Sequence, residues 1–186
     1  MDSVPIEVTM EVSIEVSMEV YTDGACKRNP GPGGWGIAIL ENGKEIYHAF
    51  GGELETTNNR MEITAIMMTL KLFVKKNDKF FRDLKFDTIT IVSDSMLCLQ
   101  TIAAKPSAVT YFFDGAKPDG WMKKWKTIGW KDKKNVDLWK KVDKYLTLAL
   151  EMYPKRIGVR WVKGHNADLG NELADKYANE GVVYEL

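Results

Sequence analysis

The stretch that decides the fold is MEVYTDGACKRNPGPGGWG, residues 18–36. Val20, Tyr21 and Thr22 are typical of the end of a β-strand, and a turn rich in glycine and proline follows Asp23. A carboxylate inside a sheet must be paired, hydrogen-bonded or bound to a metal ion, because desolvating it alone costs several kcal/mol. Asp23 could equally cap the turn, so this stretch alone leaves a structural and a functional interpretation open. The other acidic residues decide between them.

The chain has the size and composition of one globular domain. Its 186 residues suffice for one core, and 45% hydrophobic and 28% charged residues are ordinary values for a soluble protein. It contains no run of about 18 apolar residues, and its first residues lack the pattern of a secretory signal, so we expect no membrane partner. The chain has two cysteines, Cys26 and Cys98, and they form no CxxC pair. This argues against a zinc ribbon or a disulfide scaffold, and it favours a reducing, cytoplasmic location.

The formal net charge is zero because two oppositely charged regions cancel. Residues 117–144 hold ten lysines against four aspartates, whereas residues 1–19 hold five acidic residues and no lysine or arginine. A dense group of lysines is typical of a surface that follows a phosphate backbone. Overall neutrality therefore does not exclude a nucleic-acid partner.

Residues 6–21 form an internal repeat of four residues: IEVT, MEVS, IEVS and MEVY. Apolar residues alternate strictly with Glu, Ser or Thr, which is the period of a β-strand. We predict an upstream extension of the strand that leads to Asp23. It could be a pairing edge for a partner chain or a solvated extension, and the second is favoured.

The rest of the chain alternates strands with helices. Residues 35–40 and 44–51 predict two strands joined by an Asn-Gly hairpin turn, and residues 87–92 and 156–162 predict two more. Helical patterns cover residues 60–76, 121–127, 136–152 and 171–180, and a short helix reaches about residue 103. Residues 105–120 are expected to be a long loop, and residues 163–170 a polar one. The order predicts an α/β fold with an antiparallel meander followed by parallel strands.

Four carboxylates occupy comparable places in these elements. Asp23 lies at the end of the first strand, Glu62 in the first turn of the first long helix, and Asp94 just beyond the fourth strand. Asp175, in the closing helix, can be directed to the same place. Strand ends and helix starts converge on one crevice in such a sheet. Oxygen ligands favour Mg²⁺ or Mn²⁺ over Zn²⁺, and two such ions can assist hydrolysis of a phosphodiester.

In these residues the chain closely resembles a family, the cellular type 1 ribonuclease H. TDGACKRNPGPGGWG (22–36), TTNNRMEITA (56–65), SDS (93–95) and WVKGHNADLGNELAD (161–175) are similar to its signatures, in the same order. GWKDKKNVDLWKKVD (129–143) resembles the basic protrusion of many cellular members. These blocks cover nearly the whole domain, and together they are far more specific than any one of them.

The resemblance implies a ribonuclease H-like fold with a five-stranded mixed sheet flanked by helices, and an endonuclease that cuts the RNA strand of RNA/DNA hybrids with two metal ions. It implies that Asp23, Glu62, Asp94 and Asp175 are the metal-binding catalytic acids, and that His165 assists proton transfer and product departure. A loop histidine without a task is the structural alternative for His165. We expect an N-terminal extension (1–17) and a monomeric catalytic domain (18–186) whose basic protrusion lies around 121–137.

Candidate substrate contacts come from two regions. Asn29 and Asn58 are candidates for hydroxyl and groove contacts, and the family implies a pocket for a DNA phosphate around Thr57. Turn formation and helix capping are their structural alternatives, and both roles can coexist. The protrusion interleaves Trp121, Trp125 and Trp130 with lysines, of which we expect the tryptophans to be mostly in the core. The lysines expected to bind phosphates are Lys123, Lys124, Lys126 and Lys131.

Three departures from the family pattern and three competing interpretations remain. The N-terminal repeat has no counterpart in the family signature, the 105–120 loop is longer than expected, and residues 78–86 are extended before the strand. A ribonuclease H domain from a reverse transcriptase is one alternative, although the chain begins at a Met and carries no polymerase segment. A catalytically silent hybrid-binding module is another, against which the presence of all four acids argues. A transposase or integrase core shares the broad fold but matches residues 56–65 poorly.

Overall fold

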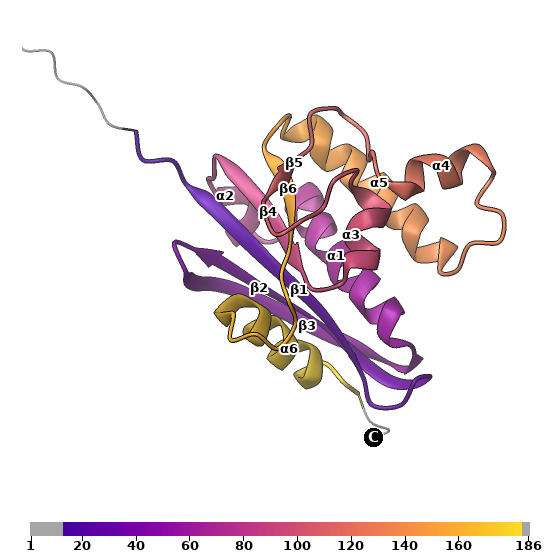
Figure 1. Ribbon diagram of the computed structural model, residues 1–186. Coiled ribbons are helices and arrows are strands. Elements are labelled where there is room, and N and C mark those ends of the chain that lie inside the picture. The colour runs from indigo at the N-terminus through magenta and orange to yellow at the C-terminus, as the bar shows by residue number, and fades with distance from the viewer. Residues whose placement is uncertain (1–12, 184–186) are drawn as a thin grey trace, which may run out of the picture.

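The strand that leads to Asp23 lies inside a mixed sheet in the computed structural model, which describes residues 13–183 (Figure 1). The strands are β1 (Ser17–Cys26), β2 (Gly31–Glu41), β3 (Lys44–Thr56), β4 (Thr88–Ser93), β5 (Tyr111–Phe112) and β6 (Ile157–Trp161). The helices are α1 (Asn58–Lys75), α2 (Lys79–Asp83), α3 (Met96–Ile102), α4 (Trp121–Thr127), α5 (Val136–Met152) and α6 (Leu169–Glu180).

The sheet order is β3-β2-β1-β4-β6-β5. β2 is antiparallel to both β1 and β3, whereas β1, β4 and β6 run parallel. This confirms the predicted meander followed by parallel strands. The prediction of five strands is wrong, because the described residues form six: β5 lies within the segment expected to be a loop. Tyr111 and Phe112 of β5 pair antiparallel with Val159 and Gly158 of β6.

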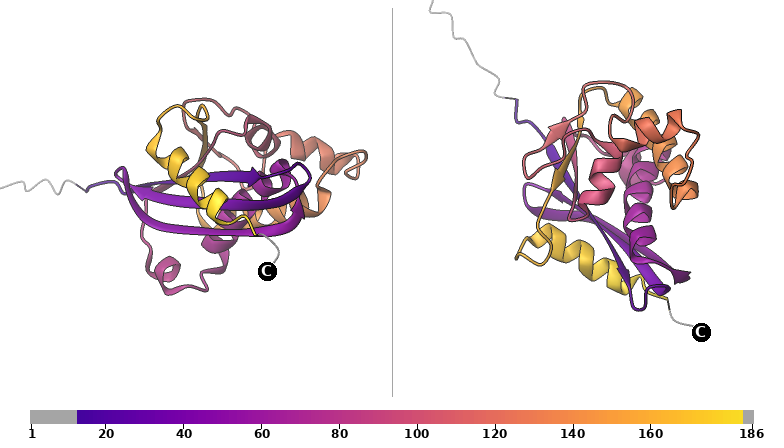
Figure 2. Two further views of the ribbon diagram at one scale, coloured as in Figure 1. Left: turned by 90° about the horizontal axis from the view of Figure 1, so that it is seen from below. Right: turned by 45° about the vertical axis from the view of Figure 1, so that its right-hand side comes forward.

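The two faces of the sheet are covered by different helices. Val20 of β1 belongs to a large core that also contains Ile63 of α1 and Leu146 of α5. Tyr21, its neighbour in sequence, belongs to a smaller core with Ala174 of α6, because successive strand residues point to opposite faces. α6 therefore packs on one face and α1 with α5 on the other (Figures 1 and 2).

Several element bounds follow from local chemistry. α1 begins two residues earlier than predicted because the Thr57 hydroxyl caps it, accepting a hydrogen bond from Arg60 N at 3.3 Å. α5 has the predicted bounds. β3 runs on to Thr56, five residues past its predicted end, and residues 79–83 of the extended segment form the short helix α2.

The last copy of the N-terminal repeat is part of β1, as the alternation predicts. Before it, Val16 exchanges hydrogen bonds with Asp87, since its amide donates to Asp87 Oδ2 at 2.7 Å and its carbonyl accepts from Asp87 N at 2.7 Å. Residues 6–12 of the repeat lie outside the described residues. None of the described helices is long and apolar enough to cross a membrane.

Candidate active site

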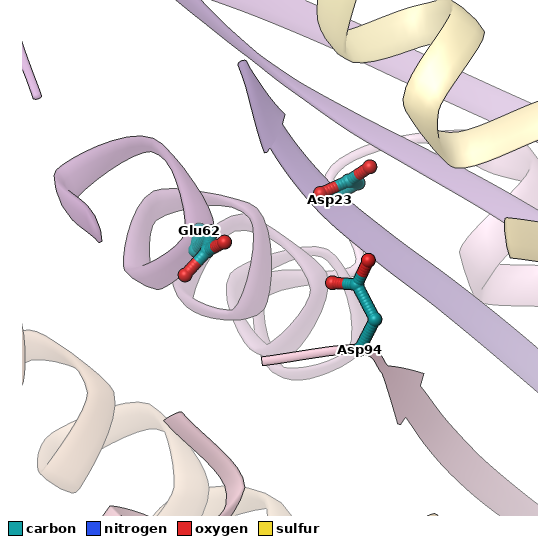
Figure 3. Close-up of side chains that lie close together, drawn as sticks. All are labelled: Asp23, Glu62 and Asp94. Carbon is teal, nitrogen blue, oxygen red and sulfur yellow. The ribbon is translucent and has the colours of Figure 1, made fainter. Parts of the chain in front are cut away.

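Three of the predicted carboxylates meet between β1, α1 and the end of β4. Asp23, Glu62 and Asp94 each offer an oxygen atom within 4.8 Å of the other two, and their side chains converge on one space (Figure 3). Two details of the prediction are wrong. β1 continues beyond Asp23 to Cys26 because its pairing with β2 extends to Gly33, and Glu62 is the fifth residue of α1 rather than part of its first turn.

Glycines allow the helices to approach β1 and β2 closely enough to build this site. A Cβ atom on Gly24 would lie 2.3 Å from Glu62 N, so only glycine beside Asp23 permits α1 to bring Glu62 this close. On the other face, a Cβ on Gly36 would lie 2.3 Å from Ala174 O of α6. The second contact seats α6 against the sheet at the residue before Asp175.

Burial and mutual repulsion raise the pKa of the three closest acids. Asp23 is 8% exposed, and its pKa rises from 3.8 to about 8, chiefly because burial penalises its charge and then because Asp94 lies nearby. Asp175 and Glu62 raise it further. The Gly24 amide, which donates to Asp23 Oδ1 at 2.7 Å, works in the opposite direction but does not offset these effects.

Glu62 and Asp94 share this environment but have hydrogen-bond donors. Burial raises the pKa of both carboxyls, and the charge of Asp94 adds to the rise at Glu62. Asn58 Nδ2 donates to Glu62 Oε1 at 3.0 Å, and Ser95 also favours the charged form of Glu62. At Asp94 the neighbouring His165 lowers the pKa.

The acids line a pocket of about 300 Å³ that also includes Asp175, His165 and Asn179. Among the described residues, no lysine or arginine lines it. A group of carboxylates with raised pKa values and no lysine or arginine to balance them suits a bound cation. Hard oxygen donors of this kind match a divalent ion such as Mg²⁺, so the donor set fits the metal site that the sequence predicts.

Comparisons with known proteins show to which family the chain belongs. The family described as RNase H matches residues 15–183. The chain belongs to the ribonuclease H family. A ribonuclease H from Polaromonas naphthalenivorans is 41% identical over 172 residues, which cover 90% of this chain and 88% of the relative. One from Hahella chejuensis is 41% identical over 168 residues, covering 90% and 94% of the two chains.

Solved ribonucleases H share the fold. LC9-RNase H1, a type 1 enzyme with the type 2 active-site motif, has a TM-score of 0.64 at 21% identity and covers 91% of this chain and 74% of its own. The foamy virus protease–reverse transcriptase has a TM-score of 0.60 at 20% identity, covering 92% of this chain and 21% of that one. At these identities the likeness shows the fold alone.

The two remaining acid–base candidates, Asp175 and His165, lie outside the closest group of three acids. Asp175 stands in α6, where Asn179 Nδ2 donates to its Oδ1 at 3.1 Å. It lines the pocket without belonging to the closest group of three acids. His165 is exposed at the pocket rim, in the loop between β6 and α6, with a φ of 54°. Its position leaves the imidazole accessible to solvent and to the pocket.

The predicted contacts near Thr57 form one small network. Asn29 Oδ1 accepts from Asn58 N at 3.3 Å, while the Asn58 side chain holds Glu62. Thr57 caps α1, which confirms the structural role predicted for it. Asn58 does not cap with its side chain and instead supports an acid. The network therefore links the turn after β1 to the start of α1, beside the acid pocket.

Sequence reasoning missed Asn171, Asn179 and Trp161. Asn171, 4% exposed, donates to Asp94 and favours its charged form. Asn179 follows Asp175 by four residues, a helical spacing that could have identified it. Trp161 Nε1 donates to the backbone oxygen of Asp94 at 3.0 Å, which links β6 to the residue after β4. No short-range pattern indicates that last contact.

The lysines predicted to bind phosphates are exposed and lie away from the acid pocket, on α4 and just beyond it. We call them the protrusion lysines: Lys123, Lys124, Lys126 and Lys131. Lys126 is paired with Asp143 at 2.8 Å. Trp125 and Trp130 pack against the large core, as predicted, but Trp121 is 46% exposed, so that part of the prediction is wrong.

Proposed function

We propose that this chain is a divalent-metal-dependent endoribonuclease that hydrolyses the RNA strand of RNA/DNA hybrids. The observation that carries the proposal is the group of three carboxylates, with oxygens within 4.8 Å of one another, in a pocket that no lysine or arginine of the described chain lines. Such a cluster is costly for an apo protein, since burial and repulsion raise the pKa of all three acids. Ribonucleases H about 40% identical to the chain support the same activity.

The residues proposed to hold metal are Asp23, Glu62, Asp94 and Asp175. Carboxylate oxygens suit Mg²⁺, with Mn²⁺ as a second candidate, and four of them can serve two ions. When bound, such ions supply an activated water and stabilise the leaving oxygen of a phosphodiester. The protein contributes the spacing of the carboxylates, fixed by α1 and α6 on opposite faces of the sheet, and the hydrogen bonds from Gly24 and Asn58 that orient them.

We assign His165 the transfer of a proton to the departing product. An imidazole can accept and donate a proton in catalysis, and the exposed loop leaves it open to both the pocket and solvent. The exposure also distinguishes it from the buried acids. It acts on the reaction after the phosphodiester is engaged, so its loss should slow turnover rather than prevent it.

The proposed substrate is an RNA/DNA hybrid. LC11-RNase H1, with a TM-score of 0.54 and 23% identity to this chain, has been solved in complex with an RNA/DNA hybrid. Ribose 2′-hydroxyls distinguish the RNA strand, and Asn29 and Asn58 beside the acid pocket offer amide groups for hydroxyl contacts. Thr57 is proposed to contact a DNA phosphate, and the protrusion lysines the backbone at a distance from the cut.

The proposed organisation is a monomeric catalytic domain, residues 18–186, preceded by an extension, residues 1–17. For the extension we keep a solvated strand as the favoured interpretation and a pairing edge as the alternative. A reducing, cytoplasmic location is proposed because Cys26 and Cys98 are both free.

The test is a comparison of three labelled duplexes, RNA/DNA hybrid, DNA/DNA and RNA/RNA, each incubated with and without Mg²⁺. We expect cleavage of the RNA strand of the hybrid only, and only with the metal. Asp94→Asn is the control for contaminating nucleases. Equal cleavage of the other duplexes would reject the proposal. Tight hybrid binding in Mg²⁺ without cleavage would also reject it and would favour a silent binding module.

A further inference from the structure

The segment of residues 103–120, for which the sequence indicates no role, is built into the fold. β5 adds an edge strand to β6, and Phe113, 1% exposed, is buried in the large core. Ser107 O accepts from Trp161 N at 2.8 Å, and Phe113 N donates to Ile157 O at 2.9 Å. The segment is thus held along β6 on one side, and it leads directly into α4 on the other (Figure 1).

Between this segment and α4 lie two adjoining hollows, of about 640 and 780 Å³, both larger than the acid pocket. They share Asp119, Lys123 and Thr127. The segment contributes Lys105 to one and Lys117 to the other, and both side chains belong to exposed residues. Lysines therefore face these hollows from both walls. Lys117 belongs to the basic stretch 117–144 noted in the sequence, whereas Lys105 lies outside it.

The acidic groups near these lysines are already engaged. Asp119, the one carboxylate of the described residues that lines the hollows, accepts hydrogen bonds from Ala104 N at 2.9 Å and from the Tyr111 hydroxyl. Those hydrogen bonds fold the segment rather than neutralise a lysine. Asp114, which is also in the segment, pairs with Lys155 at 3.3 Å. Within residues 13–183, neither Lys105 nor Lys117 has an ion-pair partner, so their charges are available to a ligand.

The hollows lie close enough to the acids for one duplex to reach both. α3 begins two residues after Asp94 and ends just before Ala103, which lines the first hollow. Its seven residues rise about 10 Å. Successive phosphates of one strand advance about 3.4 Å along the axis of a duplex, so a duplex cut at the acids needs roughly three further base pairs to reach the hollows.

We propose that the 103–120 segment and α4 form a second phosphate-binding wall, in which Lys105 and Lys117 hold the backbone of the duplex bound at the acid pocket. The inference rests on the proposed function, because it takes the same hybrid as its ligand. The wall is preorganised by the hydrogen bonds to β6 and within the segment, so little conformational entropy is lost on binding. It extends the phosphate-binding surface past the protrusion lysines to the 103–120 segment, where the loop is longer than the family pattern leads us to expect.

The test measures Kd for a hybrid of about 20 base pairs against salt concentration, in Mg²⁺, with Asp94→Asn in every arm to keep the hybrid intact. The double variant Lys105→Ala/Lys117→Ala is compared with the control double variant Lys79→Ala/Lys85→Ala. The control pair removes two exposed lysines near α2, on the opposite side of the molecule from α4 (Figure 1). Lys105→Arg with Lys117→Arg keeps the charges.

The alanine pair in the wall should raise Kd about tenfold at low salt and lower the slope of log Kd against log salt by roughly two, since each neutralised phosphate contributes about 0.9. The control pair and the arginine pair should keep the slope of the parent. An unchanged slope in the wall variant, or an equal change in the control, would overturn the inference. Neither result touches the proposed function, which fails separately if the protein with Asp94 intact does not cut the hybrid.

Discussion

Asp23→Asn should stabilise the metal-free protein, and the gain should grow with pH. The pKa of Asp23 rises from 3.8 to about 8 in the folded protein. Between these values the folded protein keeps the Asp23 proton that the unfolded chain has released. The stability associated with that proton is complete below pH 4 and is lost as the pH rises to about 8. Asparagine cannot ionise, so the variant should lack this loss.

The magnitude follows from the size of the pKa change. Each pKa unit corresponds to about 1.36 kcal/mol. The pKa rise at Asp23, a side chain only 8% exposed, therefore sets an upper limit of roughly 6 kcal/mol on the stability that Asp23→Asn gains at pH 8. Relaxation of the site and water penetration reduce the cost of a buried charge, so the expected gain is about 2–4 kcal/mol. The amide oxygen can still accept the hydrogen bond from Gly24.

The assay is urea unfolding of both proteins in EDTA from pH 4 to 9. The two free energies of unfolding should agree near pH 4 and separate as the pH rises. A gain of 2 kcal/mol would raise the melting temperature by about 4–8 °C at this chain length. Adding Mg²⁺ should stabilise the parent more than the variant, since the variant lacks a proposed ligand. A variant that is less stable at pH 8, or a difference independent of pH, would refute the reasoning.

Three further predictions concern turnover and binding. His165→Ala should lower kcat about 10²–10⁴-fold, less than Asp94→Asn does, and an equal or larger loss would mean that His165 is a ligand or a structural residue. Replacing all four protrusion lysines by alanine should raise KM more than it lowers kcat. It should also flatten the salt dependence of hybrid binding by roughly one unit of slope for each phosphate that is no longer bound. An unchanged slope would show that these lysines form a solvated face that does not bind the hybrid. Deleting residues 2–12 removes three acidic residues, which repel the phosphates of the hybrid. The deletion should modestly tighten hybrid binding at low salt without loss of cleavage. Weaker binding would show that the extension contributes to the complex.

The sequence predicted those parts of the fold in which a long periodic pattern coincides with a strong boundary signal. α5 has the predicted bounds because its apolar residues recur at helical spacing over seventeen residues. β5 was missed because two residues are too short for any alternation, and its pairing with β6 is a long-range interaction. The sequence predicts the end of β3 too early, at Gly51, where a second glycine follows. Glycine usually weakens a strand, but a Cβ on Gly52 would lie 2.0 Å from Gly181 O, so close packing at the end of α6 requires it.

The site was predictable to the extent that strand ends and helix starts converge. Asp23, Glu62 and Asp94 meet as expected, because β1 and β4 are parallel neighbours and α1 crosses beside them. The supporting hydrogen bonds and the second lysine wall were not predictable. Trp161 reaches Asp94 across 67 positions of sequence, and the lysines of the 103–120 segment face α4 only once β5 is paired. Such arrangements depend on the assembled sheet rather than on local spacing.

The most direct test of the proposed metal-dependent hydrolysis is single-turnover cleavage of a labelled RNA/DNA hybrid by the parent protein and by Asp94→Asn in Mg²⁺. Asparagine keeps the shape of the side chain and removes one carboxylate from the closest group of three. Cleavage by the parent with loss of nearly all activity in the variant, while the variant remains folded, is the predicted result. A variant that keeps more than about a tenth of the parental rate would contradict the assignment of these acids.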